Sequence, residues 1–126
     1  MQILAIDFGT KKIGLAWCDT GIGVVFPFGI IKSEDRNKAK RELEEFVKKE
    51  RVDVLVIGLP LSLYGTENKN TERIRDFASS LDLKCKVEFF DERFTSRQAD
   101  RSQGGASRDE KSAMILLESY LQKNKK

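Results

Sequence analysis

The sequence predicts one α/β domain, residues 1–126, built on a five-stranded mixed sheet with helices on both faces. Three observations support this fold class. The first third of the chain contains three β-branched apolar runs separated by short turns with glycine, which is typical of an antiparallel meander. Helical and strand patterns then alternate, and such alternation requires parallel crossover connections. The length of 126 residues matches a single domain with its own core.

The three strands of the meander are expected at residues 3–8, 13–18 and 24–31. Pro27 lies inside the third run, and proline cannot donate a hydrogen bond to a neighbouring strand. The third strand is therefore expected at an edge of the sheet or at a bulge. Trp17 lies within the second run and is expected in the core.

Two helix–strand pairs follow the meander. The charged segment 35–51 has apolar residues at helical spacing, and the almost wholly apolar run 52–58 predicts a central strand covered on both faces. A second helix is expected over 70–81 and a further strand over 84–90. The residues expected to share one face are Ala39, Leu43, Phe46 and Val47 in the first helix, Ile74, Phe77, Ala78 and Leu81 in the second, and Cys85, Val87 and Phe89 in the strand.

The last third of the chain is predicted to end in a helix. A short helix is expected at 95–101, a loop at 102–106, and a final helix from Ser107, which forms a capping box with Glu110. The apolar stripe of this final helix consists of Ala113, Leu116, Leu117, Tyr120 and Leu121. Residues 123–126 are expected to fray.

The composition excludes several classes of site. The chain has no histidine, which rules out a Ser-His-Asp triad, a Cys-His pair and a histidine-ligated metal. Cys18 and Cys85 lie far apart in apolar runs, and we expect reduced, mostly buried thiols of a cytoplasmic protein. No apolar run approaches the roughly 20 residues that span a membrane, and residues 1–9 lack the basic region of a signal peptide. The net charge of +3 permits nucleic acid as a partner.

Acidic residues are then the candidates for catalysis. Asp7 closes the apolar run 3–6 on what we expect to be the central strand, where an unpaired carboxylate is costly to bury. The turn that follows contains Gly9, which lets the backbone approach a ligand closely. Asp7 is interpreted as a metal or phosphate ligand, although hydrogen bonds to the turn alone would also account for it.

Two pairs of acidic residues are further candidates. Asp91 and Glu92 follow an apolar run at the carboxyl end of a strand, where ligands of α/β sheets collect. They would face Asp7 if the two strands were neighbours. Asp109 and Glu110 lie in the first turn of the last helix, where the helix dipole also favours acids. Both lie within about 60° of the apolar stripe, so the helical pattern does not choose between them.

Carboxylates from two strand ends and a helix start would form an oxygen-rich site without imidazole. Such a site suits Mg²⁺ or Mn²⁺. Two ions about 3.5–4 Å apart could clamp the attacking and leaving oxygens of a phosphodiester, and the metal would activate water without a histidine base. Metal-dependent phosphodiester hydrolysis is therefore a chemistry that this composition can support.

Four motifs in the chain match those of a known family. The first is 7–14, with the sequence DFGTKKIG; the second combines 58–61, GLPL, with 65–67, GTE; the third is 91–96, DERFTS. The fourth begins at Asp109 and continues with Ala113, Ile115, Leu116 and Leu117. In this order, over nearly the whole chain, the motifs resemble those of the YqgF/RuvX family.

The resemblance implies a ribonuclease H-like fold and a triad of Asp7, Glu92 and Asp109 that binds metal and carries out catalysis. It implies a cytoplasmic bacterial nuclease that acts in maturation of the 5′ end of pre-16S ribosomal RNA. Resolution of Holliday junctions is an older suggestion for the family. The basic stretch that usually precedes the last acid is nearly absent here, so we expect weak unaided binding of nucleic acid with a shallow salt dependence.

Several residues close to the predicted acids in sequence are expected to hold nucleic acid. Lys11, Lys12, Arg93 and Arg97 would contact phosphates, which gives affinity without sequence preference. Tyr64, in a polar loop beside Gly65, could stack on a base, although an ordinary loop residue would also fit that position. A protein partner that delivers the substrate would compensate for the thin basic surface, and a junction resolvase would be expected to act as a homodimer.

Two other functions are alternatives at this point. A non-catalytic nucleic-acid-binding module of the same fold would not need three acids together. A sugar kinase or actin-like ATPase carries a motif like residues 7–10, but it normally encloses its nucleotide between two lobes, and 126 residues supply one. Thermal stabilisation by ATP with Mg²⁺, but not by Mg²⁺ alone, would favour the ATPase.

Overall fold

The predicted order of strands and helices is confirmed in a computed structural model, which describes residues 1–8, 11–32, 34–60, 68–91 and 108–123. In chain order the elements are β1 (Gln2–Phe8), β2 (Lys12–Asp19), β3 (Val24–Lys32), α1 (Arg36–Lys49), β4 (Val54–Leu59), α2 (Lys69–Ser80), β5 (Lys86–Asp91) and α3 (Arg108–Lys123). Their boundaries lie within two residues of the predicted ones. The short helix and loop expected between residues 95 and 106, and the capping residue Ser107, lie outside the described residues.

The five strands form one mixed sheet in the order β3-β2-β1-β4-β5. β2 pairs antiparallel with β1 and β3, whereas β4 pairs parallel with β1 and β5. This confirms the meander, the crossovers and the central position of β1. β3 is an edge strand, as Pro27 predicts, and it also contains a bulge. Leu15 pairs with Gly29 but Ala16 pairs with Pro27, so Phe28 is an extra residue.

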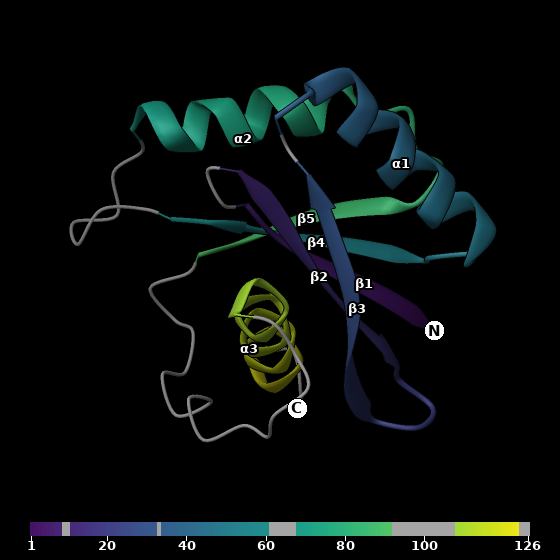
Figure 1. Cartoon of the computed structure of the whole chain (residues 1–126). Coiled ribbons are helices and arrows are strands. Elements are labelled where there is room, and N and C mark those ends of the chain that lie inside the picture. Colours follow the sequence, from purple (N-terminus) through teal and green to yellow (C-terminus); the bar gives the residue numbers. More distant parts are fainter. Residues whose placement is uncertain (9–10, 33, 61–67, 92–107, 124–126) are drawn as a thin grey trace.

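Helices cover both faces of the sheet: α1 and α2 pack on one face and α3 on the other (Figure 1). Because side chains alternate along a strand, β1 contributes Leu4 and Ile6 to the first core and Ile3 and Ala5 to the second. The helices add Ala39, Leu43, Val47, Ile74 and Phe77 to the first core, and Ala113, Leu116 and Leu117 to the second. No helix in the described ranges combines the length and the apolar character needed to cross a membrane.

Trp17 is less buried than predicted. It packs against the first core but is only partly buried, and its ring stacks on Phe26 with centroids 5.6 Å apart. Its indole N–H donates to the side-chain oxygen of Gln2 at 2.5 Å. A tryptophan must satisfy this donor, so it lies at the rim of the core beside a polar residue rather than within it.

Both cysteines are free thiols, as predicted. Cys18 is buried and Cys85 is half-buried. Burial raises the pKa of each thiol, and the charge of Asp19 adds to the effect at Cys18. The environment of both thiols therefore favours the protonated form over the thiolate.

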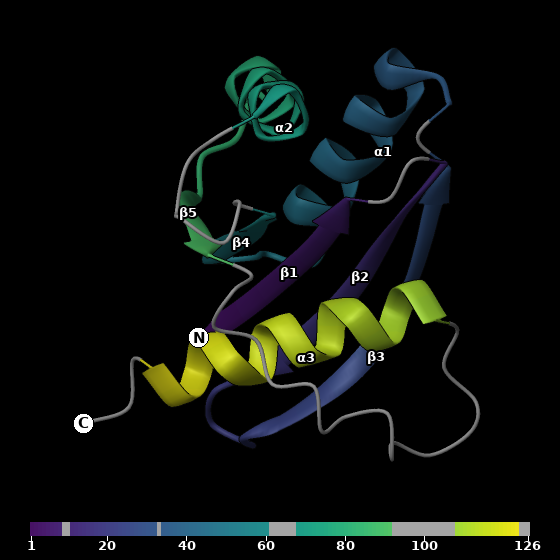
Figure 2. The same ribbon diagram turned by 90° about the vertical axis from the view of Figure 1, so that its left-hand side faces the viewer.

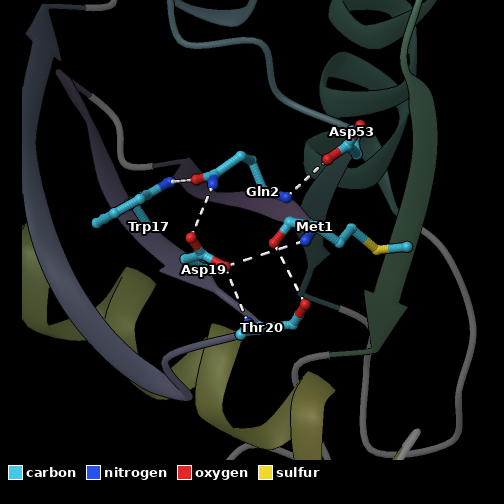
Figure 3. A network of polar contacts seen from close by, with 7 residues as sticks. Met1, Gln2, Trp17, Asp19, Thr20 and Asp53 are labelled. Carbon is cyan, nitrogen blue, oxygen red and sulfur yellow. Dashed lines mark hydrogen bonds and ion pairs between the residues drawn. The ribbon is translucent and has the colours of Figure 1, made fainter.

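A polar network joins the start of β1 to the turn between β2 and β3 (Figure 3). The Asp19 carboxylate accepts hydrogen bonds from the side-chain amide of Gln2 at 3.0 Å and from the backbone N–H of Gly21 at 2.9 Å. The Met1 amino group lies 4.0 Å from the same carboxylate. The Gly21 N–H, followed by the Gln2 amide, lowers the pKa of Asp19 below its usual value of 3.8. The folded state thus favours the charged form of Asp19.

We expect Asp19→Asn to lower stability at neutral pH and to flatten its dependence on pH. Because the folded pKa is depressed, Asp19 stabilises the fold fully above its unfolded pKa near 3.8 and loses this contribution as the pH falls through the folded value. Urea midpoints of wild type and Asp19→Asn, measured at neutral pH and well below pH 3.8, are therefore expected to converge in acid. A difference of the same size at both pH values would contradict this account.

Candidate active site

Asp7 lies near the carboxyl end of β1, on the face covered by α3. Alternation along β1 sets this face, because Ile3 and Ala5 belong to the core beneath α3 and Asp7 is the next residue in their series. Its side chain is half-buried. The central strand therefore presents one carboxylate at the boundary between core and solvent, where it can contact a ligand and water.

The sheet neighbours of Asp7 leave its carboxylate uncrowded. In the antiparallel pair of β1 and β2, Asp7 is opposite Gly14. On its other side, β1 pairs with β4 up to Ile6 and Ile57, so Gly58 is the next residue alongside Asp7. Because glycine has no side chain, neither neighbouring strand places side-chain atoms on the α3 face at this row. Of the atoms on the neighbouring strands, only backbone atoms therefore flank the carboxylate in this row.

Asp91 does not share a face with Asp7, and the condition under which the sequence would bring them together, neighbouring strands, is not met. β4 separates β5 from β1, so the strands that carry the two residues are not neighbours. Along β5, Phe90 belongs to the core beneath α3, whereas Phe89 contacts α2. Asp91 continues the series of Phe89 and faces the α2 side. Glu92, the adjoining candidate, lies outside the described residues.

The first turn of α3 lies toward the edge of the sheet at which β1 ends (Figure 2). Since α3 begins at Arg108, this turn includes Asp109 and Glu110. Glu110 is half-buried, and the side chain of Asp109 lies outside the described part of the molecule. Within the described residues, no three acidic or cysteine side chains lie close enough to hold a metal ion. The triad of Asp7, Glu92 and Asp109 therefore stays a prediction.

Tyr120 holds the later part of α3 against β5. Its hydroxyl donates to the Glu88 carboxylate, and its ring meets Phe90 edge-on with centroids 6.2 Å apart. Burial, followed by the hydrogen bond and the charge of Glu88, raises the pKa of Tyr120 to about 12. The hydroxyl therefore donates throughout the physiological pH range. Together with the buried Leu116 and Leu117, this contact fixes α3 through residues other than the predicted acids.

The predicted nucleic-acid contacts are only partly described. Lys11 and Lys12 are both exposed at the start of β2. The other predicted contacts lie outside the described residues: Tyr64, Arg93 and Arg97. Lys32, which the sequence motifs did not single out, is exposed and is the direct cross-strand partner of Lys12. No sequence signal would have revealed it, because the position of the bulge in β3 decides which face Lys32 takes.

An open pocket lies at the opposite edge of the sheet. Its walls come from the end of α1 and from the residues before β4 and β5, among them Arg51, Asp53 and Cys85. β1, β4 and β5 are parallel and all begin at this edge, whereas Asp7 lies where β1 ends. The pocket is therefore separate from the candidate active site.

Comparison with solved structures identifies the fold. Fowlpox virus Holliday junction resolvase matches with a TM-score of 0.56 and 16% identity, covering 98% of this chain and 99% of the other. Thermus thermophilus RuvC, solved in complex with a Holliday junction substrate, matches with a TM-score of 0.60 and 9% identity, covering 98% and 96%. Together with the strand order, these matches show the ribonuclease H-like fold.

Sequence comparison identifies the family. The profile of the RuvX family, described as Holliday junction resolvase, matches residues 1–123. A protein of Maridesulfovibrio salexigens named "Putative pre-16S rRNA nuclease" is 36% identical over 132 residues, which is 96% of this chain and 98% of the relative. The Escherichia coli K12 protein of the same name is 36% identical over 131 residues, 95% of each chain. The chain therefore belongs to the RuvX family of Holliday junction resolvases, a family of nucleases.

Proposed function

We propose that this protein is a metal-dependent endonuclease that hydrolyses phosphodiester bonds of structured nucleic acid, in processing the 5′ end of pre-16S ribosomal RNA. The observation that carries the proposal is Asp7, a half-buried carboxylate at the end of the central strand between Gly14 and Gly58. The shared name of the relatives supports the RNA substrate. The family description favours the second candidate, cleavage of Holliday junctions.

We assign metal binding and catalysis to Asp7, Glu92 and Asp109. Alternation along β5 supports Glu92 by exclusion, because Glu88 and Phe90 lie on the α3 side and Asp91, the other acid of the third motif, faces the α2 side. The start of α3 near the edge where β1 ends supports Asp109 (Figure 2). All three would offer carboxylate oxygens, which are the ligands that Mg²⁺ and Mn²⁺ prefer.

A bound Mg²⁺ or Mn²⁺ would supply an activated water and stabilise the leaving oxygen. The chain's own contribution is to hold the carboxylates on rigid elements, since β1 is paired on both sides and α3 is fixed by its buried stripe. Lys11, Lys12, Arg93 and Arg97 would bind backbone phosphates, and Tyr64 would stack on a base. These contacts would orient the scissile phosphate without reading sequence.

The proposed setting of this activity is the bacterial cytoplasm, with residues 1–126 acting as one domain. The protonated, unpaired thiols of Cys18 and Cys85 suit a reducing compartment. The modest net charge of +3 supports a requirement for further contacts with the substrate. A protein partner or a second copy of the chain would supply them.

Cleavage by the purified protein tests the proposed function. The substrates are a pre-16S rRNA fragment, a single-stranded RNA and a four-way DNA junction, each incubated with Mg²⁺, Mn²⁺ or EDTA. We expect cutting that requires the metal and is fastest on the rRNA fragment, whereas fastest cutting of the junction would favour the second candidate. Cutting in EDTA would contradict metal dependence. Failure of the folded protein to cut any substrate, with thermal stabilisation by ATP and Mg²⁺ together, would favour an ATPase instead.

A further inference from the structure

We propose that Lys12 and Lys32 form a phosphate-binding pair that holds the nucleic-acid backbone beside Asp7. This inference rests on the proposed nuclease function. It deepens that function by adding a substrate-binding residue, Lys32, that lies outside all four sequence motifs. The pair also predicts the direction in which a bound nucleic-acid strand crosses the sheet. The bound strand would extend from Asp7 over β2 and β3, on the side of the sheet away from β5.

The two lysines lie directly opposite each other at the end of a strand pair. Lys12 begins β2, Lys32 ends β3, and the two are cross-strand partners in the antiparallel register. Both are exposed. The Cβ atoms of such partners are about 4.5–5.5 Å apart, so both ammonium groups can reach the same phosphate or two successive phosphates of one strand.

The bulge in β3 turns Lys32 toward the α3 side. Before the bulge, Val25 packs against the core beneath α3. Regular alternation would send Ile31 to the same core, yet Ile31 packs in the core beneath α1 and α2, because Phe28 is an extra residue. The resulting shift of one residue exchanges the faces of all later positions. Lys32 therefore shares the face of Lys12, which an unbulged strand would not allow.

This face is also the face of Asp7. Gly14 lies opposite Asp7 and two residues after Lys12, so all three positions point to the α3 side. Two residues along a strand cover about 6.6 Å and neighbouring strands lie about 4.8 Å apart, which places the Cα atoms of Lys12 and Asp7 roughly 8 Å apart. Lys32 is one strand further away. A backbone held by the pair would therefore pass next to the Asp7 carboxylate.

The free protein keeps these two charges in an unfavourable arrangement. Like charges directly opposite in an antiparallel pair are destabilising. Within the described residues, neither Lys12 nor Lys32 takes part in an ion pair, and Glu34, the first acid after Lys32, takes part in none either. In the next row on this face, Gly14 of β2 and Ile30 of β3 carry no charge, and Asp7 of β1 is the nearest acid across the sheet. A bound phosphate would neutralise both lysines and remove their repulsion.

Binding by Lys32→Gln tests the pair. A labelled single-stranded RNA and a labelled four-way DNA junction are titrated in EDTA over a range of salt concentrations, with fluorescence anisotropy as the readout. Each phosphate contact contributes about 0.7–0.9 to the slope of log K against log salt. We expect the slope to fall by this amount and the affinity at about 0.1 M salt to fall about five- to eightfold for both probes.

Lys84→Gln is the matched control, because Lys84 is exposed just before β5, at the opposite edge of the sheet. It is expected to bind like the wild type. Lys32→Gln is expected to have an unchanged or slightly higher thermal midpoint, since it removes a like-charge contact. A clearly lower midpoint would indicate a structural role and overturn the proposal.

The outcomes separate this inference from the proposed function. If the wild type binds both probes and cuts with metal while Lys32→Gln binds equally well, the lysine pair is wrong and the nuclease stands. Equal losses in Lys32→Gln and Lys84→Gln would also overturn the pair, because general charge would then account for binding. If the wild type neither binds nor cuts any probe, both proposals fail.

Discussion

Replacement of Asp7 by asparagine is expected to abolish metal-dependent cleavage while the protein remains folded. Asparagine preserves the size of the side chain but removes the charge that holds a divalent cation. Substitution of residues that merely support metal ligands typically costs 10–100-fold, so we expect a loss of about 100-fold or more for a ligand itself. Single-turnover rates on the rRNA fragment and on the four-way junction, at saturating Mg²⁺ or Mn²⁺, measure this loss.

The stability of Asp7→Asn separates a catalytic role from a structural one. If Asp7 belongs to the proposed triad of acids, removing its carboxylate relieves repulsion when no metal is bound, so the thermal midpoint in EDTA is expected to be unchanged or higher. Asp76→Asn is the control for loss of charge, because Asp76 is exposed on α2 and lies on the opposite side of the sheet. It is expected to cut at the wild-type rate. Full activity of Asp7→Asn would remove Asp7 from the site.

The fold could be predicted largely because burial has a clear period in this sequence. The alternation that places Ile3 and Ile6 in different cores, and the helical spacing of Leu43 and Val47, is visible in the residues themselves. The lateral order of the parallel strands is not visible in the sequence, because it depends on how the crossover helices pack. The insertion of β4 between β1 and β5 therefore had to come from the structure.

The candidate site could be predicted only in part, because the sequence shows which acids end a strand but not which side of the sheet each one faces. Asp7 stands out because it ends a buried strand, where a carboxylate needs a function or a partner. For Asp91 and Glu92 the strand end alone could not decide which one faces Asp7, since successive residues point to opposite sides. The contacts of Phe89 and Phe90 settle this for Asp91. They leave Glu92 as the acid for mutagenesis.

The position of Lys32 shows most clearly what could not be predicted from the sequence. Proline at position 27 predicts an edge or a bulge, and the structure has both. The sequence does not say where an extra residue is accommodated, and one residue decides whether Lys32 lies on the side of Asp7 or on the side of α1. The bulge therefore links a local irregularity of β3 to the surface on which we propose that substrate binds.

Asp109→Asn is expected to lose far more activity than Glu110→Gln. The buried apolar positions Ala113, Leu116 and Leu117 define the side of α3 that packs on the sheet. At 100° per residue, position 109 lies about 35° from the centre of this side and position 110 about 65° from it. We therefore expect a loss of about 100-fold or more for Asp109→Asn and less than about tenfold for Glu110→Gln, in single-turnover cleavage with saturating metal.

The two α3 variants control for each other. Each removes one negative charge from the first turn of the helix, where such a charge stabilises by about 0.3–1 kcal/mol through the helix dipole, so their effects on stability should be similar. A difference in cleavage rate then reports position relative to the metal rather than stability of the helix. The opposite order of activities would make Glu110 the third acid and shift the fourth motif by one residue. Small losses in both variants would take α3 out of the site altogether and leave Asp7 to act with acids from the strand ends.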